Sequence, residues 1–275
     1  MKHKALGFIG AGNMASSLVG GLLADGYAAR DLWVSDVDPV KLEVLASRFG
    51  VHVSRDNRAV AETAAVLIFA VKPQILRTVA EEVADVVARS RPLILSVAAG
   101  VSEAAIDRWL GGGQAIVRCM PNTPALVKSA ATALHANERV TAAQRSTAES
   151  ILRAVGLTVW VEREELLDAV TAVSGSGPAY FFLLMEALEQ TAIELGLEPD
   201  GARLLTQQTA LGAARIAIES RDGPAELRRR VTSPQGTTER AIAVLEDGGF
   251  RSLVAEAVKA AHARAGELCQ ELGGM

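Results

Sequence analysis

Short apolar runs alternate with longer amphipathic stretches over about the first 160 residues, and this alternation limits the possible folds more than any other feature of the sequence. The short runs are apolar or β-branched and lie between turn residues, which is typical of strands. Between them, apolar residues recur at helical spacing, as in Leu42, Leu45 and Phe49. This alternation predicts a parallel sheet covered by helices. Strands are expected at residues 5–9, 32–35, 66–71, 93–97 and 115–119.

The pattern changes after Trp160, where the strand-like runs stop and helical spacing continues. Glycine, proline and aspartate separate the helical stretches, as in "GLEPDG" and "RDGP". We therefore expect two domains, an α/β domain of residues 1–162 and an all-helical domain of residues 163–275. Helices of the second domain are expected at residues 165–173, 177–195, 200–219, 224–230, 238–247 and 250–272.

The helix expected at 177–195 is apolar on nearly every face from Ala179 to Leu188. Because such a helix has to be buried on all sides, a small helical domain cannot easily enclose it. We interpret it as a helix that a second copy of the chain covers in a homodimer. The alternative is a central core helix within one copy.

The composition points away from polyanionic partners. The net charge is -4 and no basic run is longer than the arginines at 228–230, so nucleic acid and anionic membranes are not expected partners. No apolar stretch reaches transmembrane length, and glycines interrupt the first apolar run before it could act as a secretion signal. Cys119 and Cys269 have neither disulfide nor metal-ligand spacing, so we expect a cytoplasmic protein without a metal site.

The first predicted strand leads into Gly10-x-Gly12-x-x-Ala15 and then into a helix. In this context the motif is the dinucleotide fingerprint of a Rossmann-type domain. Gly10 permits the tight turn, Gly12 lets a pyrophosphate approach the backbone, and Ala15 lets the helix pack on the strand. Alternatively, the segment is a tight turn that binds nothing. The cofactor contacts expected here are Gly10, Ala11, Gly12, Asn13, Met14 and Ala15.

Asp36 lies at the expected end of the second strand, where a carboxylate usually pairs with the adenosine ribose hydroxyls and favours NAD. Ser35 could instead bond a 2′-phosphate, but no arginine follows Asp36 to neutralise that group. Asp36 could also be only a residue at a helix start. The cofactor is therefore expected to be NADP(H) and/or NAD(H), with the choice open.

Three further loops follow predicted strands: "AVKPQ" (70–74), "SVAAGV" (96–101) and "RCMPNTPA" (118–125). Because ligands of open parallel sheets bind beyond the carboxyl ends of the strands, these loops should line the cofactor. The Pro-Asn-Thr-Pro turn is rigid, and its amide and hydroxyl could face the nicotinamide.

The sequence lacks the groups with which hydroxy-acid dehydrogenases move the hydroxyl proton. The helical domain has one lysine, Lys259, and none of the histidines lies in a motif: His3, His52, His135 and His262. A substrate that carries its proton as an iminium needs no such group, because positioning by hydroxyls and amides suffices.

The segment "VTSPQGTTERA" (231–241) supplies such a lining within the helical domain. Ser233, Gly236, Thr237 and Thr238 lead into a helix, so hydroxyls, backbone amides and the helix dipole could together hold a carboxylate. The alternative is a plain helix N-cap by Ser233 or Thr237.

In their order and spacing, several motifs resemble the pyrroline-5-carboxylate reductase family over essentially the whole chain. They are "FIGAGNMA", "AVKPQ", "RCMPNTPA", "VTAVSGSGPAYFF", "QTALGAA" and "LRRRVTSPQGTTERA". The resemblance implies reduction of 1-pyrroline-5-carboxylate to L-proline by NAD(P)H, the last step of proline biosynthesis. It also implies dimers interlocked through the helical domains, often stacked into larger rings, with each active site at the dimer interface.

The resemblance also assigns residues by matching position. Ser233, Gly236, Thr237 and Thr238 would hold the substrate carboxylate, and the "SGSGP" segment (174–178) would border the ring. Thr238 would lie nearest the substrate nitrogen and is the candidate catalytic residue. Beyond the Gly10–Ala15 loop and Asp36, the expected cofactor contacts are Ser35, Asn57, Ala70, Val71, Lys72, Pro73, Ala98 and Asn122.

Two positions depart from the family pattern. Gln235 stands where the family usually has a second glycine, so the backbone there should not need a glycine-only conformation. The sequence Ser35-Asp36-Val37 lacks the arginine that members with strong NADP preference tend to carry.

Two other functions remain open on the sequence. A β-hydroxyacid dehydrogenase would need a catalytic lysine where this chain has Phe181 and Phe182. A non-catalytic dinucleotide-binding protein would leave the hydroxyl-rich loop without a purpose.

Overall fold

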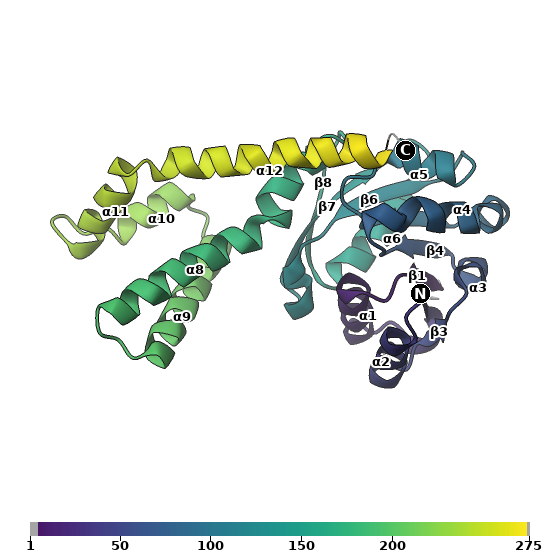
Figure 1. The fold of residues 1–275 in the computed structure, drawn as a ribbon, viewed down its shortest axis with the longest axis horizontal. Coiled ribbons are helices and arrows are strands. Elements are labelled where there is room, and N and C mark those ends of the chain that lie inside the picture. The colour runs from purple at the N-terminus through teal and green to yellow at the C-terminus, as the bar shows by residue number, and fades with distance from the viewer. Residues whose placement is uncertain (1–4, 274–275) are drawn as a thin grey trace. The chain divides into compact units, whose positions relative to one another are not determined.

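The computed structural model describes residues 5–273, which divide into two compact units (Figure 1). The first unit comprises the residues up to Ser176 together with those from Ala261 onward, and the second is Gly177–Ala260. This division falls later than the boundary expected at residue 162. The reason is that residues after the last strand still pack into the first unit, where Leu167 is 2% exposed and Ala172 is fully buried.

The first unit is built on an eight-stranded sheet with the strand order β3-β2-β1-β4-β5-β6-β7-β8. All neighbouring strands are parallel except β6 and β7, so the expected parallel sheet is confirmed apart from this one pairing. The strands are β1 (Leu6–Ile9), β2 (Leu32–Ser35), β3 (His52–Ser54), β4 (Val66–Phe69), β5 (Leu93–Ser96), β6 (Ile116–Met120), β7 (Ala130–Ala136) and β8 (Gly156–Trp160).

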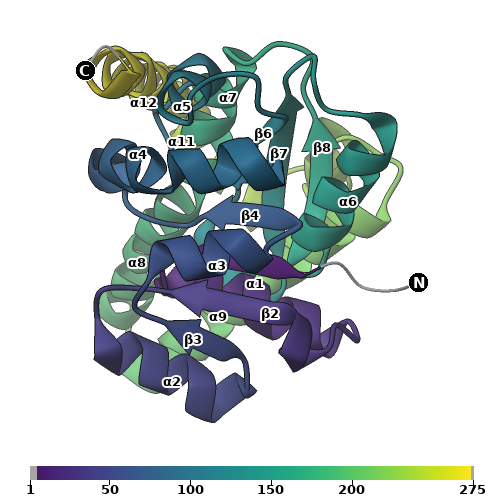
Figure 2. The same ribbon diagram turned by 90° about the vertical axis from the view of Figure 1, so that its right-hand side faces the viewer.

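Helices cover both faces of this sheet (Figure 2). The central strands β1, β4 and β5 are buried along their whole length, as parallel strands between two helical layers must be. One core cluster joins the sheet to α1, α2 and α6, and the other joins it to α3, α4 and α5. The helices are α1 (Asn13–Ala24), α2 (Pro39–Phe49), α3 (Asn57–Thr63), α4 (Pro73–Ser90), α5 (Glu103–Trp109) and α6 (Ala142–Arg153).

Two later segments complete the first unit. The short helix α7 (Leu166–Val170) passes directly into a π-helical turn, Thr171–Gly175. The last helix, α12 (Phe250–Gly273), contributes its second half: Leu272 packs against the core, and the Arg108 guanidinium donates to the Gly273 carbonyl at 2.9 Å. The final helix of the chain therefore belongs to both units.

The second unit contains α8 (Gly177–Glu194), α9 (Pro199–Glu219), α10 (Pro224–Arg230), α11 (Thr237–Asp247) and the first part of α12. These helices lie within one or two residues of the expected positions. The helices α8 and α9 lie side by side as an antiparallel pair (Figure 1).

A single copy of the second unit buries almost nothing. The buried residues of α8 to α11, which the structure describes in full, are Gly177, Ala202 and Thr206. On α8, Phe181 and Phe182 are each 64% exposed. The alternative of a central core helix within one copy is therefore wrong, and the apolar faces of this unit remain for another molecule to cover.

No helix among residues 5–273 is long and apolar enough to cross a membrane.

Candidate functional site

The glycine-rich loop after β1 has the strained turn that its sequence predicts. Gly10 adopts a φ of +104°, which L side chains rarely adopt. A Cβ atom on Gly10 would also lie 2.6 Å from the carbonyl oxygen of Ala70, which follows β4. Ala15 is fully buried against the core. Both positions therefore require the small residues that the fingerprint places there.

Open space precedes α1. Gly12 is the N-cap residue, no side chain caps this helix, and a Cβ atom at Gly12 would meet nothing within 4 Å. The first-turn amides of Asn13, Met14 and Ala15 thus have no acceptor from a capping side chain. An open space bounded by uncapped amides at a positive helix end fits the pyrophosphate of a nicotinamide dinucleotide.

The two residues expected at the adenosine ribose are engaged within the fold. The Asp36 carboxylate accepts from the Ala11 amide through Oδ2 at 2.8 Å and from the Asp38 amide through Oδ1 at 2.9 Å. Ser35 is fully buried and its hydroxyl donates to the Phe8 carbonyl at 3.4 Å. In this structure the Ser35 hydroxyl is thus turned to the backbone of β1, and the Asp36 carboxylate holds the glycine-rich loop.

The other expected cofactor residues follow neighbouring strands. Ile9 pairs with Phe69, and Phe69 pairs with Ser96, so the loops after β1, β4 and β5 begin at one edge of the sheet. Lys72 is exposed and is the N-cap residue of α4. Asn57 begins α3, and its side-chain amide donates to Glu82 at 2.9 Å. The sheet thus brings Gly10–Ala15, Ala70–Pro73 and Ala98 together, with Asn57 beyond β3.

The turn after β6 is joined to the π-helical turn. The Asn122 side chain donates to the Ser174 carbonyl at 3.0 Å and accepts from the Ala131 amide at 3.0 Å. A Cβ atom on Gly175 would lie 2.6 Å from Cε of Met120. The Asn122 carboxamide therefore fixes the "PNTP" turn against the "SGSGP" segment.

The hydroxyl-rich loop of the second unit leads into α11 as expected. The N-cap residue is Gly236, with no side chain capping the helix, so the alternative that Ser233 or Thr237 is a plain cap does not hold. Among the residues that the structure describes, the hydroxyls of Ser233, Thr237 and Thr238 have no hydrogen-bond partner. These hydroxyls and the first-turn amides form one group of unused donors.

Gln235 has a backbone conformation that is uncommon for a residue with a side chain. Its φ is +58°, in the left-handed region that favours glycine but that other residues also adopt, so this does not contradict the prediction that the position needs no glycine-only conformation. The Gln235 amide donates to the Glu239 carboxylate at 2.7 Å, and this bond holds the residue in place.

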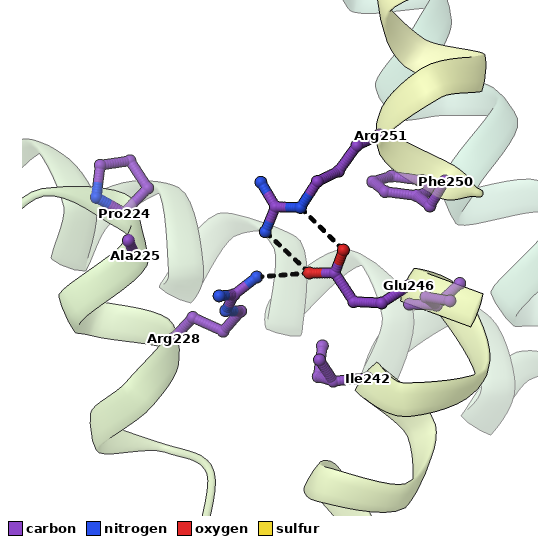
Figure 3. A pocket seen from close by; sticks show the side chains of 8 residues that line it. Pro224, Ala225, Arg228, Ile242, Glu246, Phe250 and Arg251 are labelled. Atoms are coloured by element: carbon purple, nitrogen blue, oxygen red, sulfur yellow. Dashed lines mark hydrogen bonds and ion pairs between the residues drawn. The ribbon is translucent and has the colours of Figure 1, made fainter. Parts of the chain in front are cut away.

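A pocket of about 300 Å³ lies at the other end of α11, where α10, α11 and α12 meet (Figure 3). Glu246 accepts from Arg228 at 2.9 Å and from Arg251 at 2.7 Å, and Arg251 is the main cause of its lowered pKa. Both guanidinium groups share this one carboxylate, so each arginine of the pocket is already engaged in an ion pair. The ion pairs tie together the corner that carries the hydroxyl-rich loop.

Neither the cysteines nor the histidines contribute to these loops. Burial raises the pKa of the Cys119 thiol to about 12, which excludes it as a nucleophile. His52 stacks on Trp33, His135 is buried beside Glu103, and His262 is exposed on α12. His3 lies outside the described residues. Within residues 5–273, no group of three or more His, Cys, Asp or Glu side chains could hold a metal ion.

Two family models match the chain. The model described as "Pyrroline-5-carboxylate reductase dimerisation" matches residues 164–268, and the model described as "NADP oxidoreductase coenzyme F420-dependent" matches residues 5–100. The first match starts beside the boundary expected at residue 162, ahead of the division between the compact units.

Relatives of known sequence and structure resemble the chain over nearly all of its length. A pyrroline-5-carboxylate reductase of Pseudomonas aeruginosa is 47% identical over 273 residues, which cover 99% of this chain and 100% of that protein. The solved structure of a pyrroline-5-carboxylate reductase from Coxiella burnetii is 48% identical, with a TM-score of 0.92 over 96% of this chain and 98% of that one. A Plasmodium falciparum pyrroline carboxylate reductase solved with NADP bound is 26% identical, with a TM-score of 0.87 over 98% and 99% of the chains.

Proposed function

The chain belongs to the pyrroline-5-carboxylate reductase family, and on this premise we propose which of its residues hold the substrate and the cofactor. The enzyme reduces the C=N bond of 1-pyrroline-5-carboxylate with NAD(P)H and gives L-proline, the final step of proline biosynthesis. The loops after β1, β4, β5 and β6 hold the dinucleotide. The segment from Ser233 to Thr238 holds the substrate carboxylate.

The observation that carries the proposal for the substrate is the group of unused donors before α11. Ser233 and Thr237 are exposed and Thr238 is half-buried, so these hydroxyls and the uncapped helix start are open to water or to an anion that replaces it. A carboxylate matches them in size, charge and acceptor capacity. The amides at the helix start also lie at the positive end of its dipole.

The three arginines that precede this segment are each paired with carboxylates. Arg228 is paired with Glu246, Arg229 with Glu226, and Arg230 with Asp222 and Glu226. Arg240, near the start of α11, is exposed and forms no ion pair with any residue between 5 and 273.

Positioning is the main contribution of the protein to this chemistry. When bound, the dinucleotide supplies a hydride to the imine carbon, and a substrate that arrives as an iminium needs no further proton. The Thr238 hydroxyl forms a hydrogen bond with the substrate next to the ring nitrogen. This bond fixes which face of the substrate ring is turned to the dinucleotide. Asn122 holds the "PNTP" turn in place through Ser174 and Ala131.

The protein works as a homodimer through its second unit, with the substrate site completed at the dimer interface and dimers stacked further into a ring. The support is the family model for dimerisation and the exposed apolar faces of α8. Both cysteines are free thiols, which supports a reducing cytoplasm as its location. The slightly acidic net charge of -4 supports a small-molecule partner rather than nucleic acid.

Replacement of Thr238 by alanine tests the substrate site. Thr238→Ala should lower kcat/KM for 1-pyrroline-5-carboxylate by roughly 10- to 150-fold, because a hydrogen bond to a charged group contributes about 1.5–3 kcal/mol. The affinity for the dinucleotide should stay unchanged, and Thr238→Ser should restore most of the activity. Thr232→Ala is the matched control, because the Thr232 hydroxyl already donates to the Arg228 carbonyl at 2.7 Å.

Progress curves of nicotinamide absorbance with NADPH and with NADH measure these effects. Equal losses in Thr238→Ala and Thr232→Ala would refute the assignment of the substrate site. Tight dinucleotide binding with no oxidation by the unmodified protein would instead favour the non-catalytic alternative.

A further inference from the structure

The adenosine end of the dinucleotide site carries two cations that the pattern after β2 does not reveal. In the sequence, Asp36 without a following arginine indicates a site that reads the ribose of NAD. In the structure, both oxygens of this carboxylate accept backbone amides, and its side chain is only 12% exposed. The Asp36 carboxylate is therefore already engaged by the backbone, and the charged side chains around it need to be considered.

Lys41 is the first of these cations. It lies in the first turn of α2, with Nζ 3.9 Å from Oδ2 of Asp36 and 3.8 Å from Oδ2 of Asp38. Half of its side chain is exposed, so the ammonium can turn from these carboxylates towards a ligand. Lys41 thus offsets the negative charge that would otherwise repel a phosphate.

Arg55 is the second cation, and it comes from a strand that the sequence pattern did not predict. Ser54 pairs with Ser35, and its carbonyl accepts from the Asp36 amide at 3.4 Å, so the residue after β3 lies beside the loop after β2. Arg55 is exposed and forms no ion pair with any residue between 5 and 273. An exposed, unpaired arginine thus directly follows the strand that pairs with β2.

The nearby Arg58, by contrast, is fully engaged in hydrogen bonds within the fold. Its guanidinium makes two bonds to Asp85, at 2.6 and 2.7 Å, and a third to the Glu82 carbonyl at 2.8 Å. Arg55 has none of these contacts. Since guanidinium groups bind phosphates through paired N–H donors, Arg55 is the free partner of this type next to Asp36.

We propose that Arg55 and Lys41 bind the 2′-phosphate of NADP(H), so that the chain accepts this cofactor although Asp36 occupies the position of a ribose-reading carboxylate. Lys41 moves off the carboxylates to share the phosphate with Arg55. Val37 is 80% exposed and leaves the approach open. This inference rests on the proposed function, because it concerns the specificity of the same cofactor site.

Calorimetric titration of the full chain with two adenosine nucleotides tests the inference without turnover. The unmodified protein should bind adenosine 2′,5′-bisphosphate more tightly than adenosine 5′-monophosphate. Arg55→Ala and Lys41→Ala should each weaken binding of the bisphosphate by about tenfold or more, while leaving binding of the monophosphate unchanged.

Arg30→Ala is the matched control, because Arg30 is also an exposed arginine without an ion pair but precedes β2 at the opposite edge of the sheet. It should leave both affinities unchanged. Equal losses for both nucleotides in Arg55→Ala, or tighter binding of the monophosphate by the unmodified protein, would overturn the proposal. These titrations contain no 1-pyrroline-5-carboxylate, so an inactive protein that shows the expected nucleotide pattern would refute the proposed function and leave this inference standing.

Discussion

The two units differ in how much apolar surface one copy of the chain buries. In the first unit, β1, β4 and β5 are buried from end to end between two helical layers. In the second unit, Leu183 on α8 is 67% exposed, and most of its large apolar neighbours are similarly open. Both units are rich in apolar residues, but only the first closes a core by itself.

The two units are therefore stabilised in different ways, the first within one chain and the second by contact with another copy. Burial of apolar area stabilises the first unit within one chain, at roughly 25 cal/mol per Å². In the second unit, the apolar area is buried only when a second molecule covers it. The stability of this unit is therefore linked to protein concentration. Changes in the two units should therefore respond differently to dilution and to charge.

The largest effect should come from a charge placed on the open face of the second unit. Leu183→Glu would put a carboxylate into the surface that the second copy covers, twice in each symmetric dimer, at a cost of several kcal/mol per charge. We expect loss of the dimer, measured by sedimentation equilibrium. The matched control is Leu157→Glu on the edge strand β8, where the leucine is 56% exposed, and the mass of the assembly should not change.

A dimer that persists in Leu183→Glu would show that the open face is ordinary solvent-exposed surface. The exposure of apolar residues in the second unit would then not be explained by dimer formation.

The next effect concerns the buried charges of the first unit. The Arg118 side chain is 7% exposed and donates to Glu164 at 2.7 Å, and the Glu103 amide donates to the same oxygen at 2.7 Å. Arg118→Met should destabilise the first unit by roughly 3 kcal/mol, because it leaves the partly buried Glu164 carboxylate, which is 21% exposed, without its cation. The loss, measured by chemical denaturation, should not depend on protein concentration.

The pH dependence of this variant has a defined sign. Burial, and then the nearby Glu164, raises the pKa of Glu103, so the folded state takes up a proton more readily than the unfolded chain. Its contribution to stability therefore grows as the pH falls through the raised pKa. Arg118→Met should therefore lower the free energy of unfolding less at pH 5 than at pH 8. Arg153→Met is the control: it breaks an exposed ion pair and should lower the free energy of unfolding by at most about 1 kcal/mol.

Much of the fold could be predicted because local sequence signals mark where its helices and strands begin and end. Proline begins α9 and α10, and both helices have nearly the expected bounds. Three strands are not among those predicted: β3, which has three residues and faces solvent, β7, which is mostly alanine with one β-branched residue, and the edge strand β8. The helix expected at 165–173 changes at Thr171 into a π-helical turn that packs against the turn after β6, a contact that no local pattern encodes.

The candidate site shows the same limit. The loops after the strands could be predicted, because parallel strands place their carboxyl ends at one edge. The roles of Ser35 and Asp36 could not, because they depend on hydrogen bonds to Phe8, Ala11 and Asp38 that only the folded chain creates. Arg55 was missed because its importance depends on the pairing of β3 with β2.

A smaller effect should follow from dilution alone. Each tenfold dilution should lower the stability of the dimer by about 1.4 kcal/mol, and this loss should appear in the second unit. Hydrogen exchange measures it: amides of α8 and α9 should lose protection on dilution while those of β4 and β5 keep theirs. Equal protection in both units at every concentration would contradict the distinction drawn between them.

The smallest effect concerns one residue of the second unit that is strained within a single copy. Gln235 holds a φ of +58°, and Gln235→Gly should relieve about 1 kcal/mol, offset in part by the greater freedom of glycine in the unfolded chain. We expect a small rise in Tm. Gln208→Gly inside α9 is the matched control and should lower Tm, because glycine costs about 1 kcal/mol within a helix.

The chain leaves the first unit after Ser176 and returns to it at Ala261, so the second unit is an insertion within the first. Around Gly100, the surface that receives Leu268 stays uncovered until the second half of α12 is present. During synthesis on the ribosome, the dinucleotide-binding unit therefore cannot complete its packing when its own strands emerge. It must wait for the last helix, by which time the apolar faces of the inserted unit are already exposed and able to meet those of another nascent or finished chain.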